Sequence, residues 1–323
     1  MVRKRGIGKY SLLLAAVGMI AMCVVAFIMQ PEKPLTGNLG ICLPSPNLWN
    51  INPVASWIIN TVLLGCVAAG GFFMNRTYNF IRSTEPVLPV MFLILAGSCP
   101  WITYNLCAST LLCVVNLLSL SVLFSTYKSS NATQEMFTIA TLMSVGSMFQ
   151  YAFIPMILPY IIGAIMMKAF RVKECLALLM GLIAPYWVGI GLGLIGLESF
   201  KLPDFSNFFI DFTQTSERYI LMVSVGLAIF VGAVLALNNS IKLYAGNSQV
   251  NAMNMCITIL GGVSIICVVV DFSNMIAYLA TLFFTVAVQV ANLCALWNIK
   301  KEWLVVFVPG MIYLALFILA ILT

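Results

Sequence analysis

Long apolar runs, separated by short segments that carry the charged residues, make up most of this chain. Runs of this length form helices in a lipid bilayer, because a helix satisfies its own backbone hydrogen bonds where no water is available. The alternation of apolar and polar positions that marks a membrane β-barrel is not seen. The pattern predicts an all-α, polytopic transmembrane helical bundle of about eleven spans. The expected spans cover residues 10–30, 54–74, 87–99, 104–127, 134–150, 152–169, 175–197, 218–237, 251–270, 273–296 and 303–322.

Two of the expected spans, 87–99 and 134–150, are short for a bilayer whose apolar core is about 30 Å thick, at about 1.5 Å per helical residue. We therefore expect two hairpins, residues 86–127 and residues 135–170, each with a short arm and a turn below the outer surface. If one of these hairpins re-enters the bilayer from the same side, the number of spans falls to about nine.

Basic residues fall mostly in alternate loops of this arrangement. With the N-terminus in the cytoplasm, only Lys33, Lys201 and Arg218 of the 16 basic residues lie outside. Cytoplasmic loops of membrane proteins carry an excess of lysine and arginine. The sequence therefore predicts a cytoplasmic N-terminus and, because the number of spans is odd, a C-terminus outside.

The composition supports a membrane environment. Hydrophobic residues make up 62% of the chain and charged residues 8%, with a mean hydropathy of +1.05. A soluble fold could not bury this much apolar surface, so we expect one transmembrane domain over residues 1–323 and no soluble domain. The net charge of +6 comes from short basic clusters between apolar runs. Membrane lipids, and no nucleic acid, are therefore the expected partners.

Much of the usual catalytic chemistry is missing from the sequence. There is no histidine, no Cys-x-x-Cys pair and no Walker-type glycine loop. Imidazole bases, histidine-based metal sites and nucleotide hydrolysis by a P-loop are thereby excluded, and we expect no metal and no cofactor. None of the ten carboxylates falls at the middle of a predicted span, which disfavours a carrier driven by protons or sodium ions.

A polar stripe runs along the predicted tenth span. Its members recur every three or four residues, so they share one face of the helix, and such a face should not contact lipid. Hydrogen bonding between helices is one interpretation, and the lining of a cavity is the other. The stripe consists of Asn274, Tyr278, Thr281, Thr285, Gln289 and Asn292.

The loop after the seventh expected span predicts a short helix resting on the outer membrane surface. Asp204 can cap its start, and Phe205, Phe208, Phe209 and Phe212 would share one face. The helix is either a simple connector or a gate for a lipid substrate.

Between Val54 and Gly193 the chain shows, in order, a span ending in Asn75-Arg76, a short hairpin from Pro86, a second short hairpin, Arg171-Val172-Lys173, and Ala184-Pro185-Tyr186-Trp187. This order of features resembles the membrane core of GT-C glycosyltransferases. It resembles even more closely an uncharacterised bacterial inner-membrane family with the same layout. The resemblance covers somewhat under half of the chain and lies in the pattern, without a diagnostic motif.

This resemblance implies a multi-pass protein of the bacterial inner membrane, acting in envelope or lipid-linked glycan biogenesis. In GT-C enzymes an acidic residue of the first outer loop assists attack on a lipid-phosphate-linked sugar, and outer basic groups hold the phosphate. Carried over, Glu32 is the expected catalytic carboxylate, and Lys33, Lys201, Arg218 and Asp204 are the expected substrate-binding residues. The first outer loop here is short and contains no aspartate.

Two other classes of function remain open at this stage. A non-catalytic membrane assembly or binding protein would use the same scaffold without a role for Glu32. A transporter of a small or lipidic substrate would depend on the polar stripe, particularly on Thr285 and Gln289.

Overall fold

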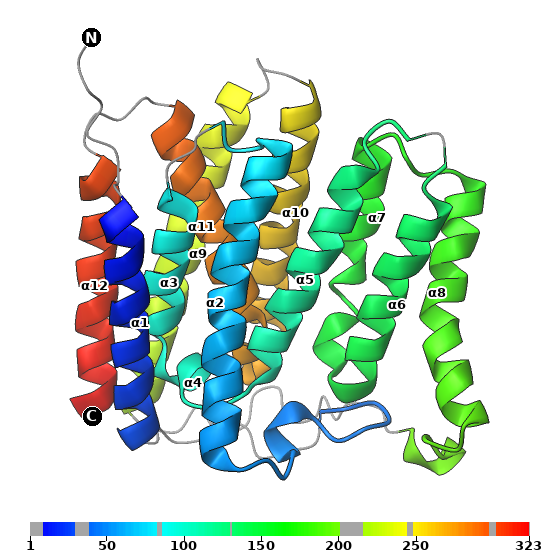
Figure 1. The fold of residues 1–323 in the computed structure, drawn as a ribbon, viewed down its shortest axis with the longest axis horizontal. Helices are drawn as coiled ribbons and strands as arrows, with labels where there is room; N and C mark the ends of the chain where they lie inside the picture. Colours follow the sequence, from blue (N-terminus) through cyan, green and yellow to red (C-terminus); the bar gives the residue numbers. More distant parts are fainter. Residues whose placement is uncertain are drawn as a thin grey trace.

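The computed structural model describes residues 9–29, 39–82, 86–129, 131–200, 216–243, 248–296 and 302–322, and all of its regular elements over these residues are helical. The long helices lie side by side and alternate in direction along the chain (Figure 1). Their bounds are α1 Lys9–Met29, α2 Pro53–Tyr78, α3 Val87–Gly97, α4 Pro100–Thr103, α5 Ala108–Ser125, α6 Thr133–Phe149, α7 Ile157–Met166, α8 Val172–Gly191, α9 Ser216–Leu243, α10 Ser248–Val270, α11 Ile276–Leu296 and α12 Glu302–Leu322. Short 3₁₀ turns are η1 Pro46–Leu48, η2 Tyr151–Phe153, η3 Leu197–Ser199 and η5 Phe272–Asn274.

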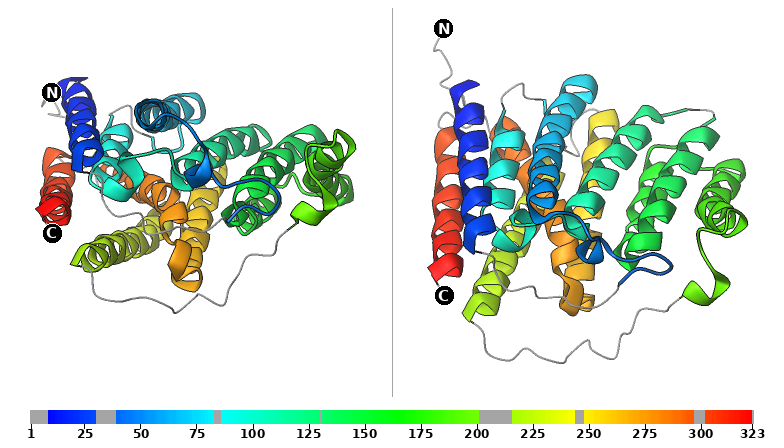
Figure 2. Two further views of the ribbon diagram at one scale, coloured as in Figure 1. Left: turned by 90° about the horizontal axis from the view of Figure 1, so that it is seen from below. Right: turned by 60° about the horizontal axis from the view of Figure 1, so that its bottom comes forward.

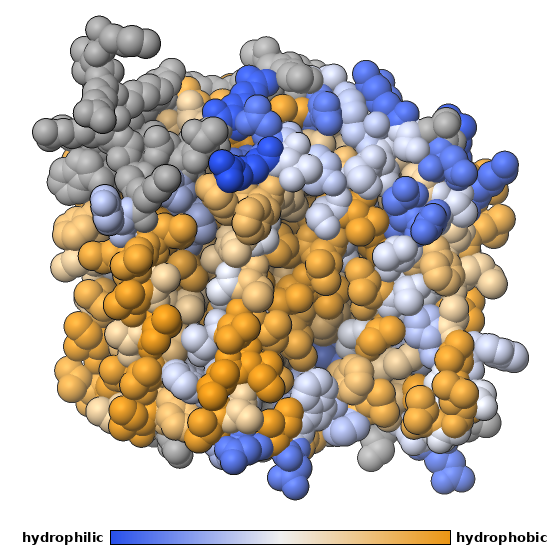
Figure 3. Space-filling model, in the orientation of Figure 1, coloured by the Kyte–Doolittle hydropathy of each residue, from blue (hydrophilic) through white to orange (hydrophobic). Residues whose placement is uncertain are grey.

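Within the described ranges, 8 helices are long and apolar enough to cross a membrane, namely α1, α2, α5 and α8 to α12. A broad apolar surface covers the middle of the bundle, and hydrophilic residues lie at its two ends, with more of them at one end (Figure 3). The chain is therefore a multi-pass membrane protein. These helices are long enough for eight of the roughly eleven expected spans. The helices found at the other three, α3, α6 and α7, are shorter.

Both predicted hairpins are present, and the second differs from expectation in its arms. In the first, the 11-residue α3 is followed by the short buried helix α4 and then by α5, and α3 packs mainly on α11, α1 and α2. In the second, α6 has 17 residues and α7 only 10, so both arms are short. The reason is that η2 and a turn containing Pro155 precede α7, and proline cannot supply the amide that would continue a helix.

The two ends of the bundle differ in charge. We call the end where α1 begins the basic end, and the end where α1 finishes the far end. Every described basic residue except Arg218 belongs to a helix terminus or turn at the basic end. The ends of α1 and α12 that bound the chain lie at opposite ends of the bundle (Figure 1). This asymmetry is the one expected for a cytoplasmic basic end, and the orientation itself stays a prediction.

Helix α11 is the centre of the bundle, and α8 lies at its edge. Nearly all residues of α11 are buried, against α3, α5, α9 and α10. Helix α8 packs almost entirely on α6 and exposes apolar side chains along its other face, and the views in Figure 2 place it at the periphery. Lipid therefore contacts α8, whereas α11 is enclosed by protein.

Helices α6 and α8 approach each other closely at Gly181. A Cβ at this position would lie 2.6 Å from the backbone oxygen of Phe137 and 2.8 Å from the Cβ of Ala140. Only glycine fits there without a shift of the backbone. Small residues at such points allow helices in lipid to pack tightly.

Candidate functional site

The polar stripe of α11 faces protein on all sides. Its six side chains are almost completely buried, none more than 4% exposed. Their hydrogen bonds reach α5, α9, α10 and the turn between α10 and α11. The stripe is therefore a seam that connects α11 to the rest of the bundle.

Near the far end of the seam, Asn116 of α5 links three helices. Its Nδ2 donates to the Thr281 hydroxyl of α11 at 3.0 Å, and its Oδ1 accepts from the Tyr160 hydroxyl of α7 at 2.8 Å. The backbone amide of Ala280 also donates to the Ser109 hydroxyl at 2.9 Å. These bonds fix α5 and α7 against the central helix.

Towards the basic end, the seam is bonded to α9 and α10. Gln289 donates to the Thr258 hydroxyl at 3.0 Å and accepts from Asn239 at 2.9 Å. Asn292 donates to Asn254 at 2.6 Å. Contacts of this kind contribute about 0.6–2 kcal/mol each in membranes. They favour the interpretation of the stripe as helix packing and give no support to a transport pathway.

At the far end, the seam leads to the carboxylate of Asp271. Asp271 lies between α10 and η5 and is 7% exposed. Its Oδ2 accepts hydrogen bonds from the Tyr151 hydroxyl at 2.5 Å, the Tyr278 hydroxyl at 3.1 Å and the Asn274 Nδ2 at 3.4 Å. The signal in the sequence was its spacing: Asp271 precedes Asn274 and Tyr278 by three and seven residues and so extends the stripe by its own period.

The electrostatics of Asp271 are set by burial among neutral groups. Burial raises the pKa of this carboxyl above its usual range, and the hydrogen bonds from Tyr151, Tyr278 and Asn274 oppose this only in part. The three donors are all uncharged. Asp271 therefore ties the turn between α6 and α7 to the turn between α10 and α11, and it releases its proton at a higher pH than an exposed aspartate.

This raised pKa predicts that stability depends on pH. The folded state holds the Asp271 proton more tightly than the unfolded chain does, so the contribution to stability is complete below about pH 4, the range of an unfolded aspartate. It is lost as the pH rises through the raised pKa of the folded state. The melting temperature in detergent should therefore fall from acidic towards neutral pH, and Asp271→Asn should reduce that fall. An unchanged slope in Asp271→Asn would contradict the assignment, and Glu198→Gln, an exposed far-end carboxylate, is the matched control.

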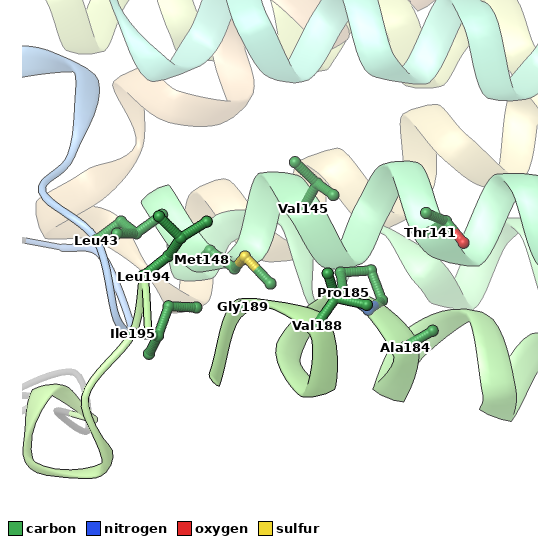
Figure 4. A pocket seen from close by; sticks show the side chains of 10 residues that line it. All are labelled: Leu43, Thr141, Val145, Met148, Ala184, Pro185, Val188, Gly189, Leu194 and Ile195. Atoms are coloured by element: carbon green, nitrogen blue, oxygen red, sulfur yellow. The ribbon is translucent and has the colours of Figure 1, made fainter. Parts of the chain in front are cut away.

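An apolar pocket of about 370 Å³ lies between α6 and α8. Figure 4 shows side chains of the two helices on opposite sides of it, with three residues from loops at one end. The one hydroxyl in the lining, that of Thr141, already donates to the Phe137 carbonyl at 2.8 Å. The pocket therefore offers no group for a polar ligand and suits a hydrocarbon. It is lined by Leu43, Thr141, Val145, Met148, Ala184, Pro185, Val188, Gly189, Leu194 and Ile195.

The pocket opens towards the surroundings of the bundle. Val188 is 54% exposed and Leu194 70% exposed, so the mouth borders the surface that lipid covers. Pro185 removes one backbone hydrogen bond from α8 at this level. A lipid chain could therefore enter from the bilayer without crossing a polar region.

The segment 39–43 connects the pocket to the Asp271 cluster. The amide of Leu43, a pocket residue, donates to the Met148 carbonyl at 3.0 Å, and the amide of Tyr151 donates to the Leu39 carbonyl at 3.1 Å. Gly40 is required in this segment, because a Cβ there would lie 1.7 Å from the Leu43 carbonyl oxygen. The segment 39–43 is thus hydrogen bonded both beside the pocket and beside Tyr151, which donates to Asp271.

Of the residues expected for catalysis and substrate binding, only Arg218 belongs to the part of the chain that the structure describes. Glu32, Lys33, Lys201 and Asp204, together with the expected interfacial helix, lie outside the described residues. Arg218 belongs to the first turn of α9, and its side chain is not described. Helices α1 and α8 end at the far end of the bundle, and α9 begins there (Figures 1 and 2). The pocket and Asp271 lie at the same end.

The chain matches no protein-family model, no curated protein and no solved structure. Among the described residues, no group of three metal-ligating side chains occurs. Fold and surface define the class, a multi-pass helical-bundle membrane protein, and the GT-C-like layout stays a prediction.

Proposed function

We propose that this protein acts in the bacterial inner membrane on a lipid-phosphate-linked sugar, in envelope or lipid-linked glycan biogenesis. The observation that carries the proposal is the apolar pocket between α6 and α8, which opens to lipid at the end of the bundle where α1 finishes and α9 begins. A ligand of such a site is an amphiphile, with a hydrocarbon chain in the pocket and a polar group at the membrane surface.

The polar part of the substrate would be handled by residues of the far-end loops. Lys33, Lys201 and Arg218 supply positive charge for the phosphate, and Glu32 accepts the proton of the acceptor hydroxyl. In the transfer, a bond forms between the acceptor oxygen and the sugar while the bond from the sugar to the phosphate oxygen breaks. The lipid phosphate leaves with the electron pair, and its charge is balanced by the basic residues.

The concentration of basic residues at the other end supports the proposed orientation. Cytoplasmic loops of inner-membrane proteins carry such an excess, so the far end would face outward. The second candidate, a non-catalytic binding protein, is favoured by the fact that the described pocket needs no reactive group to hold a hydrocarbon.

Filling the pocket provides the first test. The larger side chain of Val145→Trp should displace part of the hydrocarbon chain from the pocket. Loss of even two buried methylene groups, at about 0.8 kcal/mol each, lowers affinity about tenfold. The measurement is photolabelling of the purified protein by a lipid-phosphate-linked sugar with a photoreactive group in its hydrocarbon chain.

Val62→Trp is the matched control, because Val62 lies on α2 outside the pocket lining and is also exposed. Labelling of α6 and α8 should be normal in this variant. Equal labelling of the wild type and Val145→Trp would remove the pocket from substrate binding and with it the basis of the proposal.

A further inference from the structure

The turns at the basic end hold basic residues in a backbone conformation that favours glycine. Four described residues other than glycine have positive φ, namely Asn79 at 50°, Arg82 at 54°, Lys128 at 57° and Lys168 at 59°. The left-handed region is unfavourable by roughly 1–2 kcal/mol for most side chains, and glycine or asparagine usually occupies it. Strained residues of this kind are often found where the side chain has a role.

Lys128 and Lys168 lie in adjacent turns, after α5 and α7. The backbone amide of Lys128 donates to the Met167 carbonyl at 3.0 Å, so the turn after α5 touches the end of α7. Both side chains are exposed. In the described part of the chain, neither ammonium group forms an ion pair with a carboxylate. The two charges therefore add to one another at this surface.

A tyrosine lies between these lysines and the start of α10. The Lys128 ammonium is 5.3 Å from the centre of the Tyr127 ring, and the Tyr127 hydroxyl is hydrogen bonded to the Ser248 hydroxyl at 2.9 Å. The bond to Ser248, and after it the charges of Lys128 and Lys168, lower the pKa of the Tyr127 phenol. The positive potential of both lysines thus reaches this hydroxyl, which can donate to an anion.

Directly below Lys168, α7 exposes apolar side chains. Ile165 lies in the last turn of α7, its carbonyl accepts a hydrogen bond from the amide of Lys168 at 3.0 Å, and the residue is 57% exposed. Leu158 is also exposed further along α7, and Ile154 is exposed in the turn before it. Cationic groups thus lie above an apolar strip, and this combination fits an anionic headgroup with an acyl chain attached. A free phosphate would use only the charged part.

We propose that Lys128, Lys168 and Tyr127 bind the headgroup phosphate of an anionic phospholipid, with one acyl chain lying along Ile165 and Leu158. The phosphate is held by two ammonium groups and a phenol hydroxyl, all of which are donors. Anionic lipids are abundant in the cytoplasmic leaflet, where basic clusters at helix ends recognise them. This site is at the opposite end of the bundle from the pocket between α6 and α8 and does not depend on the proposed transfer reaction.

The test uses the full chain in detergent, titrated with phosphatidylglycerol and followed by native mass spectrometry. The double variant Lys128→Asn/Lys168→Asn removes both charges, and asparagine tolerates the left-handed backbone. Removing both charges should lower the affinity for phosphatidylglycerol about 30-fold, because each basic residue near a membrane surface contributes to the binding of anionic lipid. Lys173→Asn, an exposed lysine at the same end on α8, should bind as tightly as the wild type.

Further arms identify the ligand. The double variant Lys128→Arg/Lys168→Arg keeps both charges and should keep binding, even if the asparagine variant folds poorly. Phosphatidylcholine should bind weakly to the wild type, and glycerol phosphate should not displace phosphatidylglycerol. Equal affinity for the two lipids, or unchanged phosphatidylglycerol binding in the asparagine variant, would overturn the proposal. Displacement by glycerol phosphate would overturn the assignment to a lipid and indicate a site for soluble phosphates.

Discussion

Glu32→Gln should lower sugar transfer by about 10²–10⁴-fold, the usual effect of removing a general base. Glutamine has nearly the same shape but cannot accept the proton of the acceptor hydroxyl. The variant should still insert in the membrane and still bind the lipid-linked substrate, because the pocket between α6 and α8 is formed by other residues. The measurement is transfer of a radiolabelled sugar from its lipid phosphate to an acceptor in proteoliposomes.

The matched control is Glu198→Gln. Glu198 lies in η3 at the far end and is exposed, so its loss should leave transfer unchanged. Full transfer in Glu32→Gln would remove Glu32 from the mechanism. Substrate labelling in the pocket without transfer by the wild-type protein would instead establish the non-catalytic binding role, and this outcome is separate from the test with Val145→Trp.

Gly181→Ala should separate α6 from α8 and destabilise the protein by about 1–3 kcal/mol, the usual effect of an added methyl group in a tightly packed contact. The reason is that the new Cβ would meet a backbone oxygen, that of Phe137, at 2.6 Å. A flexible side chain could move away, but the backbone of α6 cannot do so without loss of packing. The measurement is the unfolding midpoint in a titration of mixed micelles with a denaturing detergent.

Gly262→Ala is the control for this substitution, because nothing lies within 4 Å of a Cβ at Gly262 in α10. Alanine favours a helix over glycine by up to about 1 kcal/mol, so this variant should be as stable as the wild type or more so. The contact assigned to Gly181 would be wrong if the two alanine variants unfolded together. Because α8 packs almost entirely on α6, Gly181→Ala should also reduce labelling of the pocket.

The order and position of the helices could be predicted from local pattern. Each expected span overlaps one of the described helices α1 to α3 and α5 to α12. This works because the length of an apolar run and the placement of charges are properties of neighbouring residues, and the bilayer converts them directly into helices. The short α7 was the exception, since the effect of Pro155 depends on where the turn after α6 is made.

The polar stripe shows where such reasoning stops. Its spacing identified the face of α11 that avoids lipid, and the burial of Thr281 and Gln289 agrees with this. The partners Asn116 and Asn239 lie far away in the sequence. No periodicity within one helix can name them, because they depend on which helices become neighbours.

By itself, then, the sequence determined that this chain is a membrane-spanning helical bundle, where its helices run, and that its basic residues gather on one side. Only the tertiary structure decided that Asp271 is enclosed by two tyrosines, that α8 packs tightly on α6 at Gly181, and that Lys128 lies beside the end of α7. The physical reason is that lipid chains are as apolar as leucine, so hydrophobicity does not select which faces of the helices meet. That choice is made by close packing and by hydrogen bonds between residues distant in the chain.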